Sequence, residues 1–281
     1  MRTTLLLSLS LMLLSCRKKE VQSDNFLQDT TTFVDTVTPP SEITQRKPEP
    51  DTIKYDTLVF PHIDEENYTI KTLQTGSYHG DEVPDNTAKL SWMGLFKGKN
   101  GYYIAKTGVS VIKVHDPVTE ETEKERTGRQ VKTTVKDSAI ILISGCDDIT
   151  EHKVKHITPE KTEILPGETL SFNFKGKNYS LQAVGGSYKR DNDIVFYKYN
   201  LSITGDKEGE TTTSLLVAEP CFDIAMVQVL FIGDIDGDDI PDLILNTSSN
   251  YNAESPTLYL SKPAEDKELL KPVSIHTYAG C

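Results

Sequence analysis

Short runs in which apolar and polar residues alternate follow one another from about residue 56 to the C-terminus. Residues 169–174 (Thr-Leu-Ser-Phe-Asn-Phe) are apolar at every second position, which is typical of a strand with one buried face. Turn residues separate the runs, and the stretches 98–101 and 205–209 have the composition of hairpin loops. No segment shows convincing helical periodicity. The runs predicted as strands are 102–106, 110–114, 139–144, 169–174, 179–184, 193–203, 211–217, 226–232, 242–246, 257–260 and 273–278.

This pattern predicts a mostly β protein in which residues 56–281 form an antiparallel β-sandwich or a barrel-like domain. One domain and two small domains sharing an interface both fit the length. Aromatic residues gather between Trp92 and Tyr103. A corner of the core and an aromatic platform for a ligand are the two interpretations of that cluster.

The N-terminus has the layout of a secretory signal. Residues 1–15 carry one charge, Arg2, followed by an apolar stretch that is too short to span a bilayer as a mature helix. The sequence Leu-Leu-Ser-Cys at 13–16 resembles the lipobox of bacterial lipoproteins, which implies that Cys16 carries acyl chains and anchors the mature chain to a membrane. Arg17 follows where the inner-membrane retention signal has Asp, so the resemblance implies the outer membrane, with either leaflet open. An ordinary signal peptide with an incidental Cys is the alternative.

Residues 16–55 have little apolar periodicity and are rich in Thr, Asp, Glu and Pro. A segment of this composition cannot bury enough apolar surface to offset its ordering entropy, so we expect a flexible tether. Several Asp-Thr pairs in and beside the tether resemble the acceptor of a general bacterial O-glycosylation system. That resemblance implies glycans on Thr30, Thr36, Thr52 and Thr57.

An acidic loop at 233–243 carries the most specific chemistry. Aspartates stand at positions 1, 3, 5 and 9 of the loop, and the residue at position 7 can offer its backbone carbonyl. Hard divalent cations take six to eight oxygen ligands, and alternating aspartates supply them from one short segment. The spacing therefore predicts a Ca²⁺ site, with an acidic surface turn as the alternative. The predicted ligands are Asp234, Asp236, Asp238, Ile240 and Asp242.

The loop is not an EF-hand, because position 6 is Asp239 instead of Gly and position 12 is Leu245 instead of Glu. Its flanks are rich in β-branched and large apolar residues and are therefore strand-like. The segment 231–243 resembles the strand–loop–strand of FG-GAP/VCBS repeats, in which the loop aspartates bind calcium. Asp239 departs from the Gly common in that family, although Asp tolerates a left-handed backbone better than most residues.

The formal net charge of −12 argues against nucleic acid as a partner, because such binding needs dense Lys and Arg. Besides Cys16 the chain has three cysteines. Outside the cytoplasm an odd count suggests one disulfide and one further thiol. A bridge between Cys146 and Cys221 is favoured over one that uses Cys281 to pin the C-terminal tail.

The sequence has no G-x-S-x-G nucleophile elbow, no H-E-x-x-H motif and no phosphate-binding loop. His152 and His156 are four residues apart, but in a strand or loop they would be solvated side chains and not ligands of a shared metal. Acidic neighbours raise the pKa of a thiol, which argues against Cys146 as a nucleophile. We therefore expect no enzyme but a membrane-anchored binding or adhesion module with a protein or glycan ligand. An envelope-assembly scaffold and a metal-dependent hydrolase are the alternatives.

Overall fold

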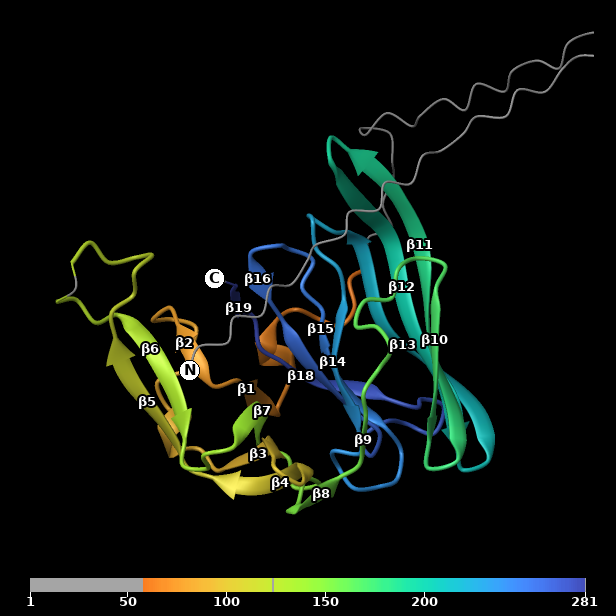
Figure 1. Cartoon of the computed structure of the whole chain (residues 1–281), viewed down its shortest axis with the longest axis horizontal. Coiled ribbons are helices and arrows are strands. Elements are labelled where there is room, and N and C mark those ends of the chain that lie inside the picture. The colour runs from red at the N-terminus through yellow and green to blue at the C-terminus, as the bar shows by residue number, and fades with distance from the viewer. Residues whose placement is uncertain (1–57, 123, 281) are drawn as a thin grey trace, which may run out of the picture. The chain divides into compact units, whose positions relative to one another are not determined.

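The computed structural model describes residues 58–122 and 124–280, which form antiparallel sheets with two short 3₁₀ turns, η2 (Glu65–Asn67) and η3 (Thr87–Lys89) (Figure 1). The predicted mostly β, antiparallel fold is confirmed. Within the described part of the chain, no helix has the length and apolar character needed to cross a membrane. The predictions for the signal peptide 1–15, the tether 16–55 and their sites lie outside the described residues; those sites are Cys16, Thr30, Thr36, Thr52 and Thr57.

Four sheets hold most of the strands: the N-terminal sheet, the small sheet, the central sheet and the long-strand sheet. The N-terminal sheet has the order β1 (Lys71–Leu73), β7 (Ser138–Ser144), β3 (Trp92–Gly98), β4 (Gly101–Thr107), β8 (His152–Val154). The small sheet has the order β2 (Gly76–Tyr78), β6 (Gly128–Thr133), β5 (Val109–Val114).

The strands of the other two sheets all lie in the second half of the chain. The central sheet has the order β18 (Lys271–Ile275), β17 (Pro256–Leu260), β15 (Asp242–Asn246), β14 (Gln228–Gly233), β9 (His156–Ile157). The long-strand sheet has the order β10 (Thr169–Phe174), β11 (Lys177–Arg190), β12 (Asp193–Lys207), β13 (Glu210–Cys221). A short pair, β16 (Ala253–Glu254) and β19 (Tyr278–Ala279), completes the set.

The central sheet is buried on both faces, which explains its continuous apolar sequence. Successive side chains of a strand point to opposite faces. In β15, Leu243 and Leu245 enter the core shared with the long-strand sheet, whereas Ile244 enters the core shared with the N-terminal sheet. All three side chains are fully buried. The run therefore shows no alternation, because both of its faces need apolar residues.

The N-terminal sheet repeats this arrangement. In β7, Ile141 and Ile143 face the central sheet, and Leu142 joins the core shared with the small sheet. Trp92 and Phe96 belong to this second core, and both are almost completely buried. The aromatic cluster is therefore part of the core. Two sheets, the central and the N-terminal, are thus each covered on both faces.

The favoured disulfide between Cys146 and Cys221 is not formed, because both are free thiols and half-buried. Cys146 follows β7 and packs against the core between the N-terminal and central sheets. Cys221 ends β13 in the long-strand sheet, which packs on the other face of the central sheet. A disulfide needs Cα atoms within about 7 Å, and an intervening sheet prevents that approach. Cys281 lies outside the described residues.

Candidate metal centre

The acidic loop connects two neighbouring strands of the central sheet. Strand β14 ends at Gly233, which pairs with Asp242 at the start of β15. The residues between them must reverse the chain within a short span, and two of them, Gly237 (φ 79°) and Asp239 (φ 74°), take the left-handed conformation. Asp adopts this conformation at lower cost than most residues, so the loop accommodates a non-glycine residue at position 239.

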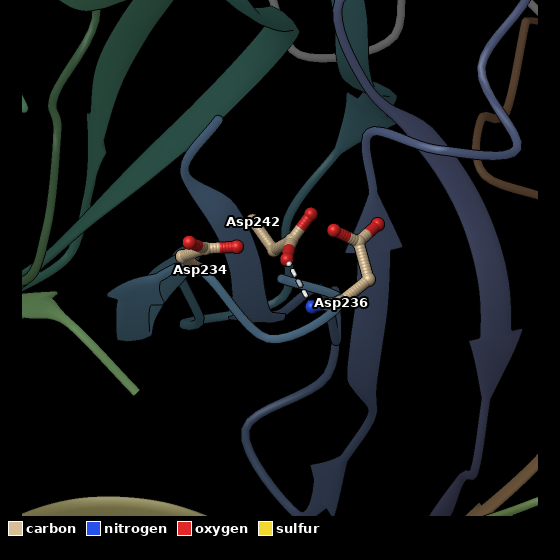
Figure 2. Close-up of side chains that lie close together, drawn as sticks. All are labelled: Asp234, Asp236 and Asp242. Carbon is tan, nitrogen blue, oxygen red and sulfur yellow. Dashed lines mark hydrogen bonds between the residues drawn. The ribbon is translucent and has the colours of Figure 1, made fainter. Parts of the chain in front are cut away.

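Three of the predicted ligands converge in this loop. Asp234, Asp236 and Asp242 are 5%, 2% and 0% exposed, and each offers a carboxylate oxygen within 4.8 Å of those of the other two (Figure 2). Asp238 is half-buried, and its Oδ1 accepts a hydrogen bond from the backbone N–H of Ile240 at 2.8 Å. The side chain of Ile240 packs against the core. Among the described residues, the converging group thus contains three of the four predicted aspartates.

Backbone N–H groups hold the carboxylates in place. Asp242 Oδ2 accepts hydrogen bonds from the N–H groups of Ile235 at 2.6 Å and Asp236 at 3.0 Å. Asp234 Oδ1 accepts one from the N–H of Asp238 at 2.9 Å. These bonds run across the loop, so the loop conformation and the carboxylate positions depend on one another.

Ser261, directly after β17, brings a hydroxyl into the middle of the acids. Its Oγ lies 2.7 Å from Asp238 Oδ2, 3.2 Å from Asp242 Oδ1 and 3.4 Å from Asp236 Oδ2. A serine hydroxyl has one proton, so it can donate to only one of the three oxygens. The neighbouring N–H of Lys262 donates to Asp236 Oδ2 at 3.0 Å, whereas Asp236 Oδ1 is buried with no hydrogen-bond partner in the described part of the chain. The site therefore holds more acceptor oxygens than donors.

The electrostatics show the same deficit of positive charge. Burial raises the pKa of Asp236 to about 6; the backbone N–H and the charge of Lys262 oppose this rise, and the charges of Asp238 and Asp234 add to it. Burial also holds the pKa of Asp242 well above its usual range, and the charge of Asp236 adds to that effect. Buried carboxylates that lack sufficient positive partners favour their neutral form. A divalent cation among them would reverse this preference, because it compensates the buried charge.

Groups from two other sheets contact the loop. Lys175, in the turn between β10 and β11 of the long-strand sheet, forms ion pairs with Asp234 (2.8 Å) and with the exposed Asp239. His152, in β8 of the N-terminal sheet, has its Nε2 3.2 Å from the backbone carbonyl oxygen of Asp234. The loop is thus a junction of three sheets.

The two histidines four residues apart, His152 and His156, make different contacts. His152 contacts the loop through a carbonyl oxygen, whereas His156 in β9 packs its ring against those of Tyr102 (4.4 Å between centroids) and Phe231 (6.3 Å). Neither belongs to the metal-capable group found among the described residues.

The donor set suits a hard cation. All converging side-chain ligands are carboxylate oxygens, and such ligands select Mg²⁺, Ca²⁺ or Mn²⁺ over the softer transition metals. One side of the loop, at Asp238 and Ile240, borders a hollow of about 660 Å³ whose lining includes Ser261 and Lys262. The residues present can therefore hold a metal ion. Comparison of the chain with protein-family models, curated proteins and solved structures finds no match.

Proposed function

We propose that this chain is a lipid-anchored outer-membrane protein whose β-rich domain is a binding or adhesion module stabilised by calcium. The observation that carries the calcium proposal is the buried Asp236 carboxylate, whose Oδ1 lacks a partner among the described residues while further aspartate oxygens converge beside it. A cation that takes six to eight oxygens at about 2.3–2.6 Å accommodates such a set better than the smaller, strictly octahedral Mg²⁺.

In this proposal the ion acts as a structural brace. The loop touches the long-strand sheet through Lys175 and the N-terminal sheet through His152, so fixing the loop restrains the contacts of three sheets. A ligand that binds only the folded state raises its stability by RT ln(1 + [L]/Kd), which is about 2.7 kcal/mol at a hundredfold excess over Kd.

Thermal unfolding of the metal-stripped protein with excess calcium and with chelator tests this role. We expect a higher melting temperature with calcium, and Asp236→Ala should remove most of the difference. Asp239→Ala is the matched control, because its carboxylate is exposed and stands outside the converging group. Equal melting temperatures in calcium and chelator would refute the brace.

The anchoring proposal rests on the sequence at 13–16. We expect the native protein in the membrane fraction and Cys16→Ser in the soluble fraction. A Cys16→Ser chain that stays membrane-bound with unchanged mobility contradicts lipidation. For the tether, the intact mass of the envelope-purified protein should exceed that of the lipidated polypeptide by hexose-sized increments if Thr30, Thr36, Thr52 and Thr57 carry glycans. Peptide mapping then assigns the increments to individual residues, and a mass equal to the lipidated polypeptide rejects this modification.

The binding role has two alternatives with distinct outcomes. A pulldown from envelope extract that returns a glycan or a single protein favours a binding or adhesion module, whereas recovery of envelope-assembly machinery favours a scaffold. Calcium-dependent turnover of generic ester, phosphate or glycoside substrates would instead favour a metal-dependent hydrolase.

A further inference from the structure

A second candidate site is a cavity where β13 of the long-strand sheet meets the ends of β15 and β18 of the central sheet. Its volume is about 140 Å³. One wall is the segment 59–63, which is held against β13 by two backbone hydrogen bonds between Phe60 and Ala218, of 2.9 and 2.7 Å. The other walls come from β13, from the loop that follows β15, from β16 and from the end of β18.

The lining of this cavity has an apolar side and a polar side. Val59, Phe60 and Ile63 contribute apolar surface, and Val59 and Ile63 are 42% and 64% exposed, so their apolar surface stays accessible. The polar side carries hydroxyl groups, among them those of Ser255 and Thr277, whose oxygens lie 2.9 Å apart. An occupant with a short apolar body and a polar head group therefore matches the lining.

Glu219 of β13 is the only charged residue among those that line the cavity. Its Oε1 accepts a hydrogen bond from the N–H of Cys221 at 3.2 Å, and its carboxylate also accepts one from the side chain of Ser249, which lines the cavity as well. In the described part of the chain no Lys, Arg or His forms an ion pair with it.

The charge of this carboxylate is thus left without a cation. Burial raises the pKa of Glu219, and the hydrogen bonds from Cys221 and Ser249 oppose that rise without cancelling it. A half-buried carboxylate favours its neutral form unless positive charge lies beside it. Since every other lining residue is uncharged, a cation that enters the cavity meets one compensating charge and no competing one.

We propose that this cavity binds a small primary ammonium ligand, which donates hydrogen bonds to the Glu219 carboxylate and to the neighbouring hydroxyl oxygens while its alkyl chain packs against Phe60 and Ile63. An ammonium group has three donors and no acceptor, which suits a carboxylate surrounded by hydroxyl groups. Engineered cavities of about 150 Å³ bind benzene, so a four-carbon amine fits this volume. An inorganic cation would leave the apolar side of the cavity unused.

Two probes of equal size test the assignment by titration calorimetry on the full chain, with calcium present throughout. Butylamine is a cation at pH 7.5, because alkyl ammonium groups such as that of Lys have a pKa of about 10.4, whereas 1-butanol is neutral. We expect one saturable site per chain that binds the amine roughly 10- to 150-fold more tightly than the alcohol, the range that a hydrogen bond to a charged group provides.

Three results would overturn the proposal. Equal affinities would show that the carboxylate does not select the ligand. No saturable heat from butylamine up to about 20 mM would show that there is no site. Displacement of the amine by an equal concentration of KCl would show that the cavity takes an inorganic cation.

A charge-removing variant then locates the binding. Glu219→Gln keeps the shape of the side chain and should reduce the affinity for butylamine to that for 1-butanol. Glu210→Gln is the matched control, because Glu210 is an exposed acid of the same strand outside the cavity, and it should bind the amine as the parent does. A cooperatively folded Glu219→Gln chain with the parent's affinity would prove the proposal wrong. The lining includes none of the converging aspartates, so these titrations and the calcium experiments fail or succeed separately.

Discussion

Replacing Asp242 with Asn is the sharpest perturbation of the acidic loop, because it keeps the shape of the side chain and changes only its charge and one oxygen. In the parent chain, Oδ2 accepts from the N–H groups of Ile235 and Asp236, and Oδ1 accepts from the N–H of Ser261 at 2.9 Å. An amide has one acceptor oxygen and one NH₂ group. Either orientation of the amide therefore faces its NH₂ toward at least one backbone N–H.

The change in the free energy of unfolding that we expect for Asp242→Asn follows from these contacts. An unsatisfied buried N–H costs about 1–3 kcal/mol, and replacing a charged acceptor by a neutral one weakens each remaining bond by about 1 kcal/mol. In chelator a gain in stability opposes these losses, because the neutral amide replaces a buried carboxylate. Burial raises the pKa of that carboxylate well above its usual range, which shows that its charge is unfavourable there. With calcium bound that gain disappears and a ligand oxygen is lost. We expect Asp242→Asn to lower the free energy of unfolding by roughly 2–4 kcal/mol in calcium and by clearly less in chelator.

Urea unfolding followed by the fluorescence of the buried Trp92 measures both values. Asp239→Asn is the control, and we expect a change within about 0.5 kcal/mol because its carboxylate is exposed. An Asp242→Asn chain as stable as the parent in calcium would refute the hydrogen-bond argument. An equal loss of stability in calcium and in chelator would refute the argument that, without calcium, the amide gains by removing a buried carboxylate charge.

Two further predictions concern other parts of the fold. The hydrogen bond of 2.6 Å to Asp116 raises the pKa of His79, so NMR titration should place its midpoint above 6.5, and Asp116→Asn should lower it. Because the folded pKa is raised, this pair stabilises the fold fully below pH 6.5 and loses that contribution as the pH rises through the folded pKa; an unshifted midpoint would disprove the pairing. Gly205→Ala should lower the free energy of unfolding by about 1–3 kcal/mol, because the added Cβ would clash with the buried ring of Tyr179. Gly280→Ala is the control: the added Cβ would lie 3.5 Å from its nearest neighbouring atom, so we expect no change in the same urea assay.

The fold class was accessible from the sequence because alternation and turn residues are local signals. The predicted run 169–174 coincides with β10, and 242–246 coincides with β15. Strand β6 was not predicted. It reads Gly-Arg-Gln-Val-Lys-Thr, in which only the valine is apolar, so it has no alternating pattern. Pairing with β2 and β5, which no local pattern shows, holds it in the sheet. Burial of the central sheet on both faces was missed as well, since no local pattern states which layers cover a strand.

The residues of the candidate site were likewise predicted only where the signal is local. Asp234, Asp236 and Asp242 lie within one loop, so their spacing alone predicted that they converge. Ser261 and Lys175 stand 19 residues after and 59 residues before their aspartate partners, and an isolated serine or lysine carries no signal of such a contact. The disulfide prediction was wrong for the related reason that the cysteine count says nothing about which sheet carries each thiol.

Calcium binding to the metal-stripped protein, measured by equilibrium dialysis, tests the central claim most directly. We expect a single saturable site per chain with a Kd of about 0.1–1 mM, as is common for extracellular modules. Asp236→Ala should abolish the uptake and Asp239→Ala should retain it. A parent chain that takes up no calcium at several times that concentration would contradict the proposal that the buried aspartates of this loop form a calcium site.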